Sequence, residues 1–271
     1  MGDIALRNNV KIFGQGNDAL LFAHGFGCDQ NMWRLITPAF SQNYRIIVFD
    51  YVGCGKSEAS AYNIERYSTL DGYAQDLIEI CEELNLKNIT FVGHSVSAMI
   101  GAVALIKKTA LFSSMVWIGP SPCYVNDDIY TGGFDKKDLD DLLDIMENNY
   151  LGWAGFLAPA IMKNGDRPEL ASELEESFCA TDTFITKRFA KVTFFSDNRN
   201  DLSKIKIPVL IMQCADDIIA PESVGDYISA KVANSKIVRM KATGHCPHLS
   251  HPKETIQIIQ DFLAENNYSN A

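Results

Sequence analysis

The sequence predicts an α/β fold, in which a mostly parallel sheet is covered by helices and interrupted once by a helical insertion. Three observations support this prediction: short apolar runs recur along the chain, amphipathic stretches separate them, and one long interval has helical patterns without strands. With 271 residues and a 47% hydrophobic composition, the chain has enough apolar side chains to bury one large core. We therefore expect one main domain.

The apolar runs have the length and the composition of buried strands. They are rich in valine, isoleucine and phenylalanine, and their apolar residues are consecutive rather than alternate, which is typical of strands covered on both faces. We expect strands at residues 19–23, 45–49, 89–92, 114–118, 209–212 and 236–240. Because helical stretches separate them, neighbouring strands should run parallel.

Helical spacing predicts the elements that cover the sheet. It occurs at Leu70, Tyr73, Leu77, Ile80 and Leu84, and again at Ile256, Ile259 and Phe262. Between about residues 120 and 200, helical patterns at 138–146, 169–178 and 184–195 follow one another without a strand. Such an insertion lies beyond the carboxyl ends of parallel strands, where ligands bind. We expect a core of residues 1–120 and 201–271, and a helical lid of residues 121–200.

The charge and the cysteine content argue against several classes of function. The formal net charge of −10 opposes binding to DNA or RNA. We find no apolar run of the kind that forms a signal peptide or a membrane span, so the expected location is the cytoplasm. The seven cysteines are an odd number without a C-x-x-C pair, which favours reduced thiols and no metal. Cys246 adjoins a histidine, but neighbouring side chains on an extended chain point apart, so a catalytic thiol is the weaker alternative to a serine.

The stretch Gly93-His94-Ser95-Val96-Ser97 follows a predicted strand and begins a helical stretch. A serine at such a turn is lifted clear of the sheet, and the amino terminus of the helix favours the negative charge that develops there. The flanking residues must be small, and Ser97 adds a side chain where the usual pattern has a second glycine. Taken alone, the motif fits a nucleophile and a serine that only caps the helix equally well.

A nucleophilic serine of this type needs a carboxylate and then a histidine, each in a loop after a later strand. Asp217 lies in an acidic loop after the strand at 209–212, with Asp216 as the alternative. His245 lies in the loop after the strand at 236–240 and is the expected base. The chain order of the three residues favours a nucleophile at Ser95 over a helix cap.

The other histidines are expected to have no chemical role. His248 and His251 stand three residues apart, a spacing that also occurs in metal sites, but a proline beside each of them disfavours a regular helix. We therefore expect these two to be solvent-exposed loop residues. His24 follows a core strand and should be structural, and His94 should line the end of the sheet without doing chemistry.

Two glycine-rich stretches need separate interpretations. "HGFG", at residues 24–27, allows a backbone turn that points the Phe26 amide at the same spot as the Val96 amide, which would form an oxyanion hole. "DYVGCGKS", at residues 50–57, ends like a phosphate-binding loop, but Asp50 replaces its first glycine and no helical pattern follows. Because the dinucleotide-binding glycine spacing does not occur either, we expect no nucleotide and no cofactor.

Together these motifs resemble those of the α/β-hydrolase family. "HGFG", "DYVGCGKS", "GHSVS", "CADDIIAP" and "GHCPH" occur in the expected order between residues 21 and 248. Within the family, the sequence is most similar to the RsbQ-type regulators of the bacterial general stress sigma factor σB. It is also similar to the strigolactone and karrikin receptors of plants, whose lid resembles residues 149–153, 158–159 and 194–197.

The resemblance implies an α/β-hydrolase fold, a serine hydrolase activity and a set of site residues. Ser95 would be the nucleophile, His245 the base and Asp217 the acid that orients it; Phe26 and Val96 would supply the oxyanion amides; Phe26, Phe134 and Phe194 would line an apolar pocket under the lid. The implied ligand is a small hydrophobic ester or lactone-like molecule. The implied partner is RsbP, a PAS-domain phosphatase that activates σB under energy stress.

The sequence departs from the commoner hydrolase pattern in two places. Ser97 replaces a glycine, and Tyr51-Val52 stands where enzymes with the pattern D-x-R-G-x-G-x-S have an arginine. The second departure weakens an inference to any specific metabolic esterase. Two alternatives remain, namely a metabolic carboxylesterase or carbon–carbon hydrolase without a regulatory partner, and a binding module whose triad no longer turns substrate over.

Overall fold

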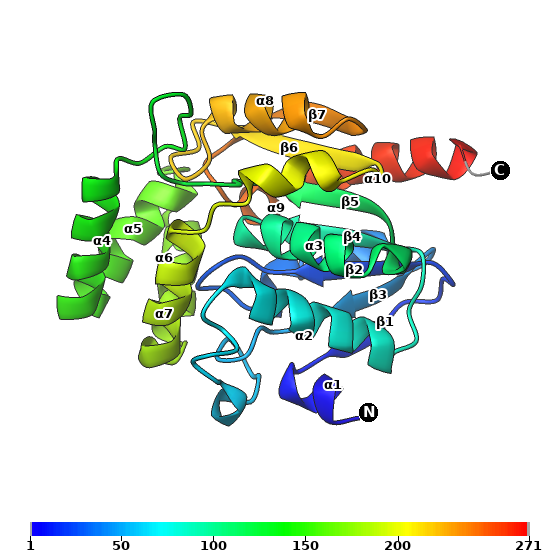
Figure 1. Ribbon diagram of the computed structural model, residues 1–271, viewed down its shortest axis with the longest axis horizontal. Helices are drawn as coiled ribbons and strands as arrows, with labels where there is room; N and C mark the ends of the chain where they lie inside the picture. Colours follow the sequence, from blue (N-terminus) through cyan, green and yellow to red (C-terminus); the bar gives the residue numbers. More distant parts are fainter. Residues whose placement is uncertain (1, 270–271) are drawn as a thin grey trace.

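The computed structural model, which describes residues 2–269, is built on a seven-stranded sheet with the strand order β1-β3-β2-β4-β5-β6-β7 (Figure 1). The strands are β1 (Lys11–Phe13), β2 (Ala19–Ala23), β3 (Arg45–Val48), β4 (Ile89–His94), β5 (Phe112–Ile118), β6 (Val209–Ala215) and β7 (Ser235–Thr243). Only the β1–β3 pair is antiparallel among these strands. All six predicted strands are confirmed, as is the mostly parallel sheet.

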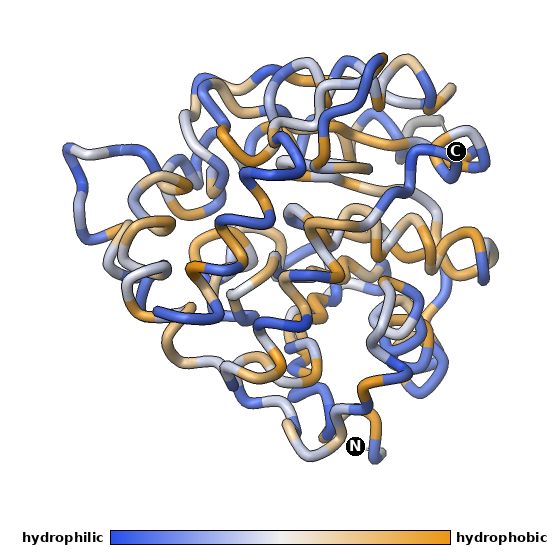
Figure 2. The backbone as a smooth tube through the Cα atoms, turned by 60° about the vertical axis from the view of Figure 1, so that its left-hand side comes forward, coloured by the Kyte–Doolittle hydropathy of each residue, from blue (hydrophilic) through white to orange (hydrophobic). Residues whose placement is uncertain are grey.

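The consecutive apolar residues of the strands supply two separate cores. In β6, for example, Val209 and Ile211 join the core on one face, and Leu210 and Met212 join the core on the other. The reason is that successive side chains of a strand point to opposite faces. In Figure 2 many segments in the interior of the molecule are hydrophobic, whereas many of the outer loops are hydrophilic.

Helices cover both faces of the sheet. Residues of α1 (Asp3–Arg7), α2 (Leu70–Glu83), α3 (Val96–Lys107) and α8 (Glu222–Lys231) belong to the core of one face. The opposite core includes residues of α10 (Pro252–Ser269) and residues in and beside the 3-10 turns Gln30–Trp33 and Thr37–Ala39, and α9 (Pro247–Ser250) precedes α10. Further 3-10 turns lie at Ala59–Ala61, Thr109–Leu111 and Arg199–Lys204. None of the helices in the described chain is both long and apolar enough to cross a membrane.

Four helices form the insertion between β5 and β6, and they lie together to one side of the sheet, at the left of Figure 1. They are α4 (Lys136–Asn148), α5 (Tyr150–Met162), α6 (Pro168–Cys179) and α7 (Thr183–Phe194), and they share a third apolar core. Three of them match the predicted helical stretches. That the insertion is a separate lid domain with the bounds 121–200 stays a prediction.

Among the elements that the sequence analysis missed, β1 and α5 are the most informative. β1 is a three-residue edge strand with exposed ends, so it has no apolar run to reveal it. α5 reads YLGWAGFLAPAIM and has no polar stripe, because it packs against both α4 and α6. A helix that is apolar on most sides has no 3.6-residue pattern for a periodicity argument to find.

Candidate active site

Ser95 occupies the turn between β4 and α3 in a backbone conformation that side-chain-bearing residues rarely adopt. Its φ is 58° and its ψ is −125°, and its N–H donates to the carbonyl of Ile118 at 2.8 Å. Gly93 makes this turn possible, because a Cβ at that position would lie 2.9 Å from backbone atoms of Ser97. Backbone strain of this kind is typical of a nucleophile held clear of its sheet.

Ser95, His245 and Asp217 form a continuous hydrogen-bonded chain. The Nε2 atom of His245 lies 2.8 Å from Oγ of Ser95, and its Nδ1 atom lies 2.7 Å from Oδ2 of Asp217. All three residues are buried. The second carboxylate oxygen of Asp217 accepts the backbone N–H groups of Ile219 and Ala220 at 2.9 and 3.1 Å. The carboxylate is therefore held in one orientation, with one oxygen free for the histidine.

The structure distinguishes the two candidate acids. Asp216 has a side chain that is 64% exposed and pairs with Lys163 at 3.2 Å, whereas the side chain of Asp217 is fully buried against His245. Gly119, with φ of 58°, makes room for this pair, since a Cβ there would lie 3.0 Å from the imidazole. Asp217 is thus the acid in contact with the histidine.

The loop that carries His245 is fixed by the insertion and by the nucleophile turn. The backbone N–H of His245 donates to the carbonyl of Ile161 at 2.9 Å, and Ile161 lies in the last turn of α5. The carbonyl of His245 accepts the Nε2–H of His94 at 2.9 Å. As predicted, His94 lines the end of the sheet, and a backbone hydrogen bond links the insertion directly to the histidine that contacts the serine.

The two predicted oxyanion donors, Phe26 and Val96, belong to segments that meet at the nucleophile turn. Phe26 follows β2 in the glycine-rich loop, and Val96 is the first residue of α3. A Cβ on Gly25 would lie 2.5 Å from the His94 ring and 3.3 Å from the Cβ of Ser95, so this loop lies directly against the nucleophile turn. Their function as oxyanion donors stays a prediction.

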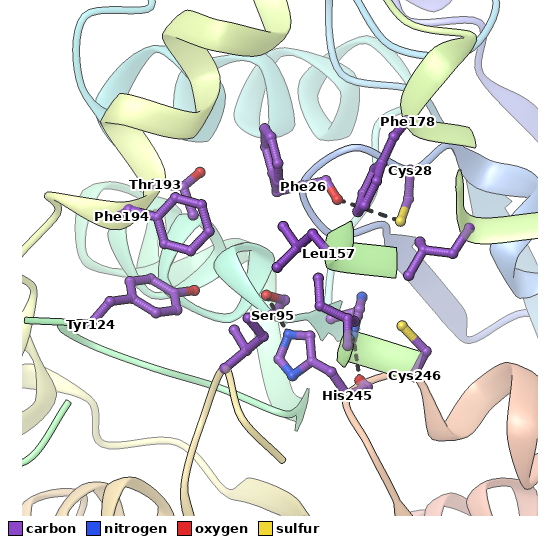
Figure 3. Close-up of a pocket in the computed structure, with 14 residues that line it drawn as sticks. Phe26, Cys28, Ser95, Tyr124, Leu157, Phe178, Thr193, Phe194, His245 and Cys246 are labelled. Carbon is purple, nitrogen blue, oxygen red and sulfur yellow. Dashed lines mark hydrogen bonds between the residues drawn. The ribbon is translucent and has the colours of Figure 1, made fainter. Parts of the chain in front are cut away.

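A mostly apolar cavity opens over Ser95 and His245, beneath the helical insertion (Figure 3). The space between its lining atoms, with the solvent at its mouth included, is about 420 Å³, of which only about 30 Å³ can hold the centre of a water molecule. Its lining includes Phe26 and Phe194. That these side chains bind a substrate stays a prediction. Phe134, which was also expected in the lining, is not among the lining residues and packs against Phe194, with ring centroids 6.2 Å apart. The cause is the course of the loop before α4, which places Phe134 against the apolar core of the insertion.

The sequence analysis missed two polar residues of the cavity. Tyr124 points its hydroxyl toward Ser95 in Figure 3, and the two hydroxyls are close enough to interact. Thr193 lies on α7, and its hydroxyl has no hydrogen-bond partner among the described residues. Burial raises the pKa of Tyr124, so its hydroxyl stays protonated and able to donate. Both residues come from segments that no catalytic motif marks, so their place at the site follows only from the fold.

The prediction that His248 is an exposed loop residue is wrong. Its ring is fully buried, with centroids 4.8 Å from Trp33 and 4.5 Å from His94, because the short helix α9 turns it inward. Burial lowers its pKa to about 3, and neither ring nitrogen has a partner among the described residues. His251 is half-buried, and its Nδ1 lies 2.9 Å from the Ser250 hydroxyl.

His94, Cys246 and His248 offer metal-ligand atoms within 4.8 Å of one another. One feature opposes an ion at this cluster: burial raises the pKa of the Cys246 thiol well above its usual range, so a metal would have to displace a tightly held proton. The same burial makes Cys246 a poor nucleophile. His94 donates its Nε2–H to a backbone carbonyl, which leaves its Nδ1 without a partner among the described residues.

His24 and the loop at residues 50–57 are structural. His24 is fully buried, and its Nδ1–H donates to the carbonyl of Gly25 at 2.8 Å. In the loop, the carboxylate of Asp50 accepts the backbone N–H groups of Gln30 and Lys56 at 2.8 and 3.0 Å. The Lys56 N–H, which a phosphate-binding loop would direct at its ligand, is therefore bonded to a side chain of the protein.

Comparison with known proteins agrees with this geometry. The chain matches the model of the alpha/beta hydrolase family over residues 20–258. It is 37% identical to strigolactone esterase D14 of Arabidopsis thaliana, over 94% of this chain and 96% of that protein. It is also 37% identical to the karrikin insensitive 2 receptor CA of Petunia hybrida, over 96% of each chain. A hydrolase from Oleispira antarctica superposes with a TM-score of 0.94 at 43% identity, over 97% of this chain and 96% of that one.

Proposed function

The chain belongs to the α/β-hydrolase family, and from this membership we propose that it is a serine hydrolase for a small hydrophobic ester or lactone-like ligand. The observation that carries the proposal is the hydrogen-bonded chain from Ser95 through His245 to Asp217 at the floor of an apolar cavity. The relatedness to a strigolactone esterase and to a karrikin receptor supports a ligand of this class.

The proposed reaction is acyl transfer to water through a covalent Ser95 intermediate. His245 takes the proton from the Ser95 hydroxyl as the oxygen attacks the ligand's carbonyl carbon, and Asp217 keeps the Nδ1 proton in place so that Nε2 is the acceptor. The amides of Phe26 and Val96 stabilise the oxyanion. His245 then gives its proton to the leaving oxygen, and a water molecule, activated in the same way, releases the acid.

The cavity supports a compact and largely apolar ligand. The lining has aromatic surface from Phe26, Phe178 and Phe194, which favours the binding of apolar rings or short acyl chains. The Thr193 hydroxyl, which has no partner among the described residues, favours a ligand with at least one polar atom besides the reacting carbonyl, because a fully apolar ligand would leave it buried and unsatisfied.

We further propose that the protein is an RsbQ-like positive regulator of σB under energy stress, with the phosphatase RsbP as its partner. This regulatory role rests on the resemblance of the motifs. The hydrogen bond from His245 to Ile161 supports it physically, because a change at the catalytic loop would act directly on a lid helix that a partner could contact. A metabolic carboxylesterase or carbon–carbon hydrolase without a partner is the alternative.

A paired measurement tests both parts. Ester turnover and a σB-dependent reporter are measured in cells that carry RsbP and in which the gene for this chain is deleted or replaced. The replacements are the wild type, Ser95→Ala and the control Ser203→Ala, which alters an exposed serine outside the cavity. Loss of both activities in Ser95→Ala alone supports signalling that requires catalysis. Loss of turnover with normal reporter activity would identify a binding module. Reporter activity that does not change when the chain is deleted would refute the regulatory role and support the metabolic enzyme.

A further inference from the structure

The two departures from the commoner hydrolase pattern, at Ser97 and at Tyr51, are in contact with each other. The Tyr51 hydroxyl lies 2.8 Å from the Ser97 hydroxyl, and both residues are fully buried. They come from different segments, since Tyr51 follows β3 and Ser97 lies in the first turn of α3. The hydroxyl that stands in place of a glycine therefore has a specific partner.

The direction of these hydrogen bonds follows from counting protons. The Ser97 hydroxyl also lies within hydrogen-bonding distance of the carbonyl of His24, which has only lone pairs to offer. Ser97 has one proton and must donate it there, so it accepts the proton of Tyr51. Burial raises the pKa of Tyr51, which keeps that proton on the phenol.

His24 closes the set of bonds. Its Nε2 accepts the backbone N–H of Tyr51 at 3.2 Å, and its Nδ1–H donates to the carbonyl of Gly25 at 2.8 Å. Burial lowers the pKa of His24, so the ring is neutral and has a single proton for this purpose. The loop after β2, the loop after β3 and the start of α3 are thus joined by a closed ring of hydrogen bonds through His24, Tyr51 and Ser97, which we name the brace.

The brace lies next to both proposed oxyanion donors. His24 is two residues before Phe26, and Ser97 is one residue after Val96. An oxyanion hole requires two amides from different segments to point at one position. The bond from Ser97 to the carbonyl of His24 joins those two segments directly.

We propose that the hydroxyls of Ser97 and Tyr51 are positioning groups, which keep the Phe26 amide pointed at the same position as the Val96 amide. This inference rests on the proposed hydrolase function. Because the oxyanion exists only in the transition state, the brace contributes to kcat and not to binding of the ligand. Neither hydroxyl belongs to the cavity lining, so neither contacts the ligand.

The test uses the full-length protein with p-nitrophenyl acetate as substrate, and compares the wild type with Tyr51→Phe, Ser97→Ala and the double variant. Tyr51→Phe removes one oxygen atom and leaves the Ser97–His24 bond, whereas Ser97→Ala breaks both bonds of the hydroxyl. We expect kcat to fall about threefold in Tyr51→Phe and about tenfold in Ser97→Ala, with KM unchanged within about twofold. These losses are smaller than the roughly 10²- to 10³-fold loss on removing an oxyanion donor, because the amide is displaced and not lost.

The double variant and the pH profile separate positioning from general damage to the fold. The double variant should match Ser97→Ala, because that substitution already breaks the bond that Tyr51→Phe breaks. The pH dependence of kcat should keep its midpoint, since His245 and Asp217 retain their contacts. Tyr73→Phe is the matched control, because Tyr73 is fully buried with its ring 5.7 Å from that of Tyr51, and its hydroxyl is not one of the groups that form the brace.

Three results are possible, and each decides a different point. Reduced kcat in the brace variants with normal activity in Tyr73→Phe supports the brace. Wild-type kcat in folded Tyr51→Phe and Ser97→Ala, or a loss that appears only in KM, overturns the brace and leaves the hydrolase function intact. A wild-type protein that neither hydrolyses the ester nor is labelled at Ser95 by a sulfonyl fluoride overturns the hydrolase function, and the brace with it.

Discussion

Replacing Asp217 by asparagine should reverse the hydrogen bonding of His245 while leaving the fold unchanged. One carboxylate oxygen of Asp217 accepts two backbone N–H groups, so the amide oxygen of an asparagine would keep that side and its NH₂ group would face Nδ1 of His245. Two donors cannot share one hydrogen bond. The imidazole would therefore shift its proton to Nε2 and present a donor, not an acceptor, to Ser95.

The size of the effect follows from the loss of the base. In serine hydrolases of this type, a triad whose histidine is held in the wrong tautomer loses about 10⁴-fold in kcat, which is equivalent to about 5.5 kcal/mol of activation free energy. We expect a loss of this order in Asp217→Asn, measured as kcat on p-nitrophenyl acetate. Thermal unfolding of the same sample checks that the protein is folded.

Asp216→Asn is the matched control for this prediction. It makes the same chemical change one residue away, at an exposed carboxylate that forms an ion pair with Lys163. Its kcat should stay within about twofold of the wild type, because exposed ion pairs contribute little. A folded Asp217→Asn protein with more than about a tenth of the wild-type kcat, or an inactive Asp216→Asn protein, would refute the assignment of the acid.

Two other predictions concern stability and the shape of the cavity. Burial lowers the pKa of His248 to about 3, so between about pH 6.5 and pH 3 the unfolded chain binds a proton at this residue and the folded chain does not. The contribution of the neutral His248 to the free energy of unfolding is therefore complete above about pH 6.5 and is lost as the pH falls toward 3. In urea unfolding, the wild type should lose about 2 kcal/mol more than His248→Phe between pH 7 and pH 5, and equal losses would count against this burial. Phe194→Ala should increase the preference for longer p-nitrophenyl esters, whereas Phe134→Ala should not, because only the first ring lines the cavity; the opposite result would restore Phe134 to the pocket.

The fold was largely predictable because its strands are marked by continuous apolar runs. Those runs are apolar on both faces, and each face has its own core, as in β6. β1 and α5 were not predictable for opposite reasons: the edge strand has too few apolar residues, and the apolar helix has too many to show a stripe. Periodicity identifies elements that have one face in the core and one in water.

The order of motifs along the chain predicted the three residues of the triad, but it could not predict their surroundings. The choice between Asp216 and Asp217 depended on which carboxylate the loop turns inward. His248 was expected to be exposed because its neighbouring prolines indicate a loop, yet the short helix α9 buries it. The contact between Tyr51 and Ser97 joins residues 46 positions apart, and no local pattern contains that information.

Covalent labelling of Ser95 tests the nucleophile most directly. The wild type, Ser95→Ala and His245→Ala are treated with a serine-reactive sulfonyl fluoride, and the modified peptide is identified by mass spectrometry. We predict one adduct, on Ser95, in the wild type alone, because Ser95 is nucleophilic only while His245 accepts its proton. Undiminished labelling of Ser95 in His245→Ala, or an adduct of the wild type on a residue other than Ser95, would contradict the assignment of nucleophile and base.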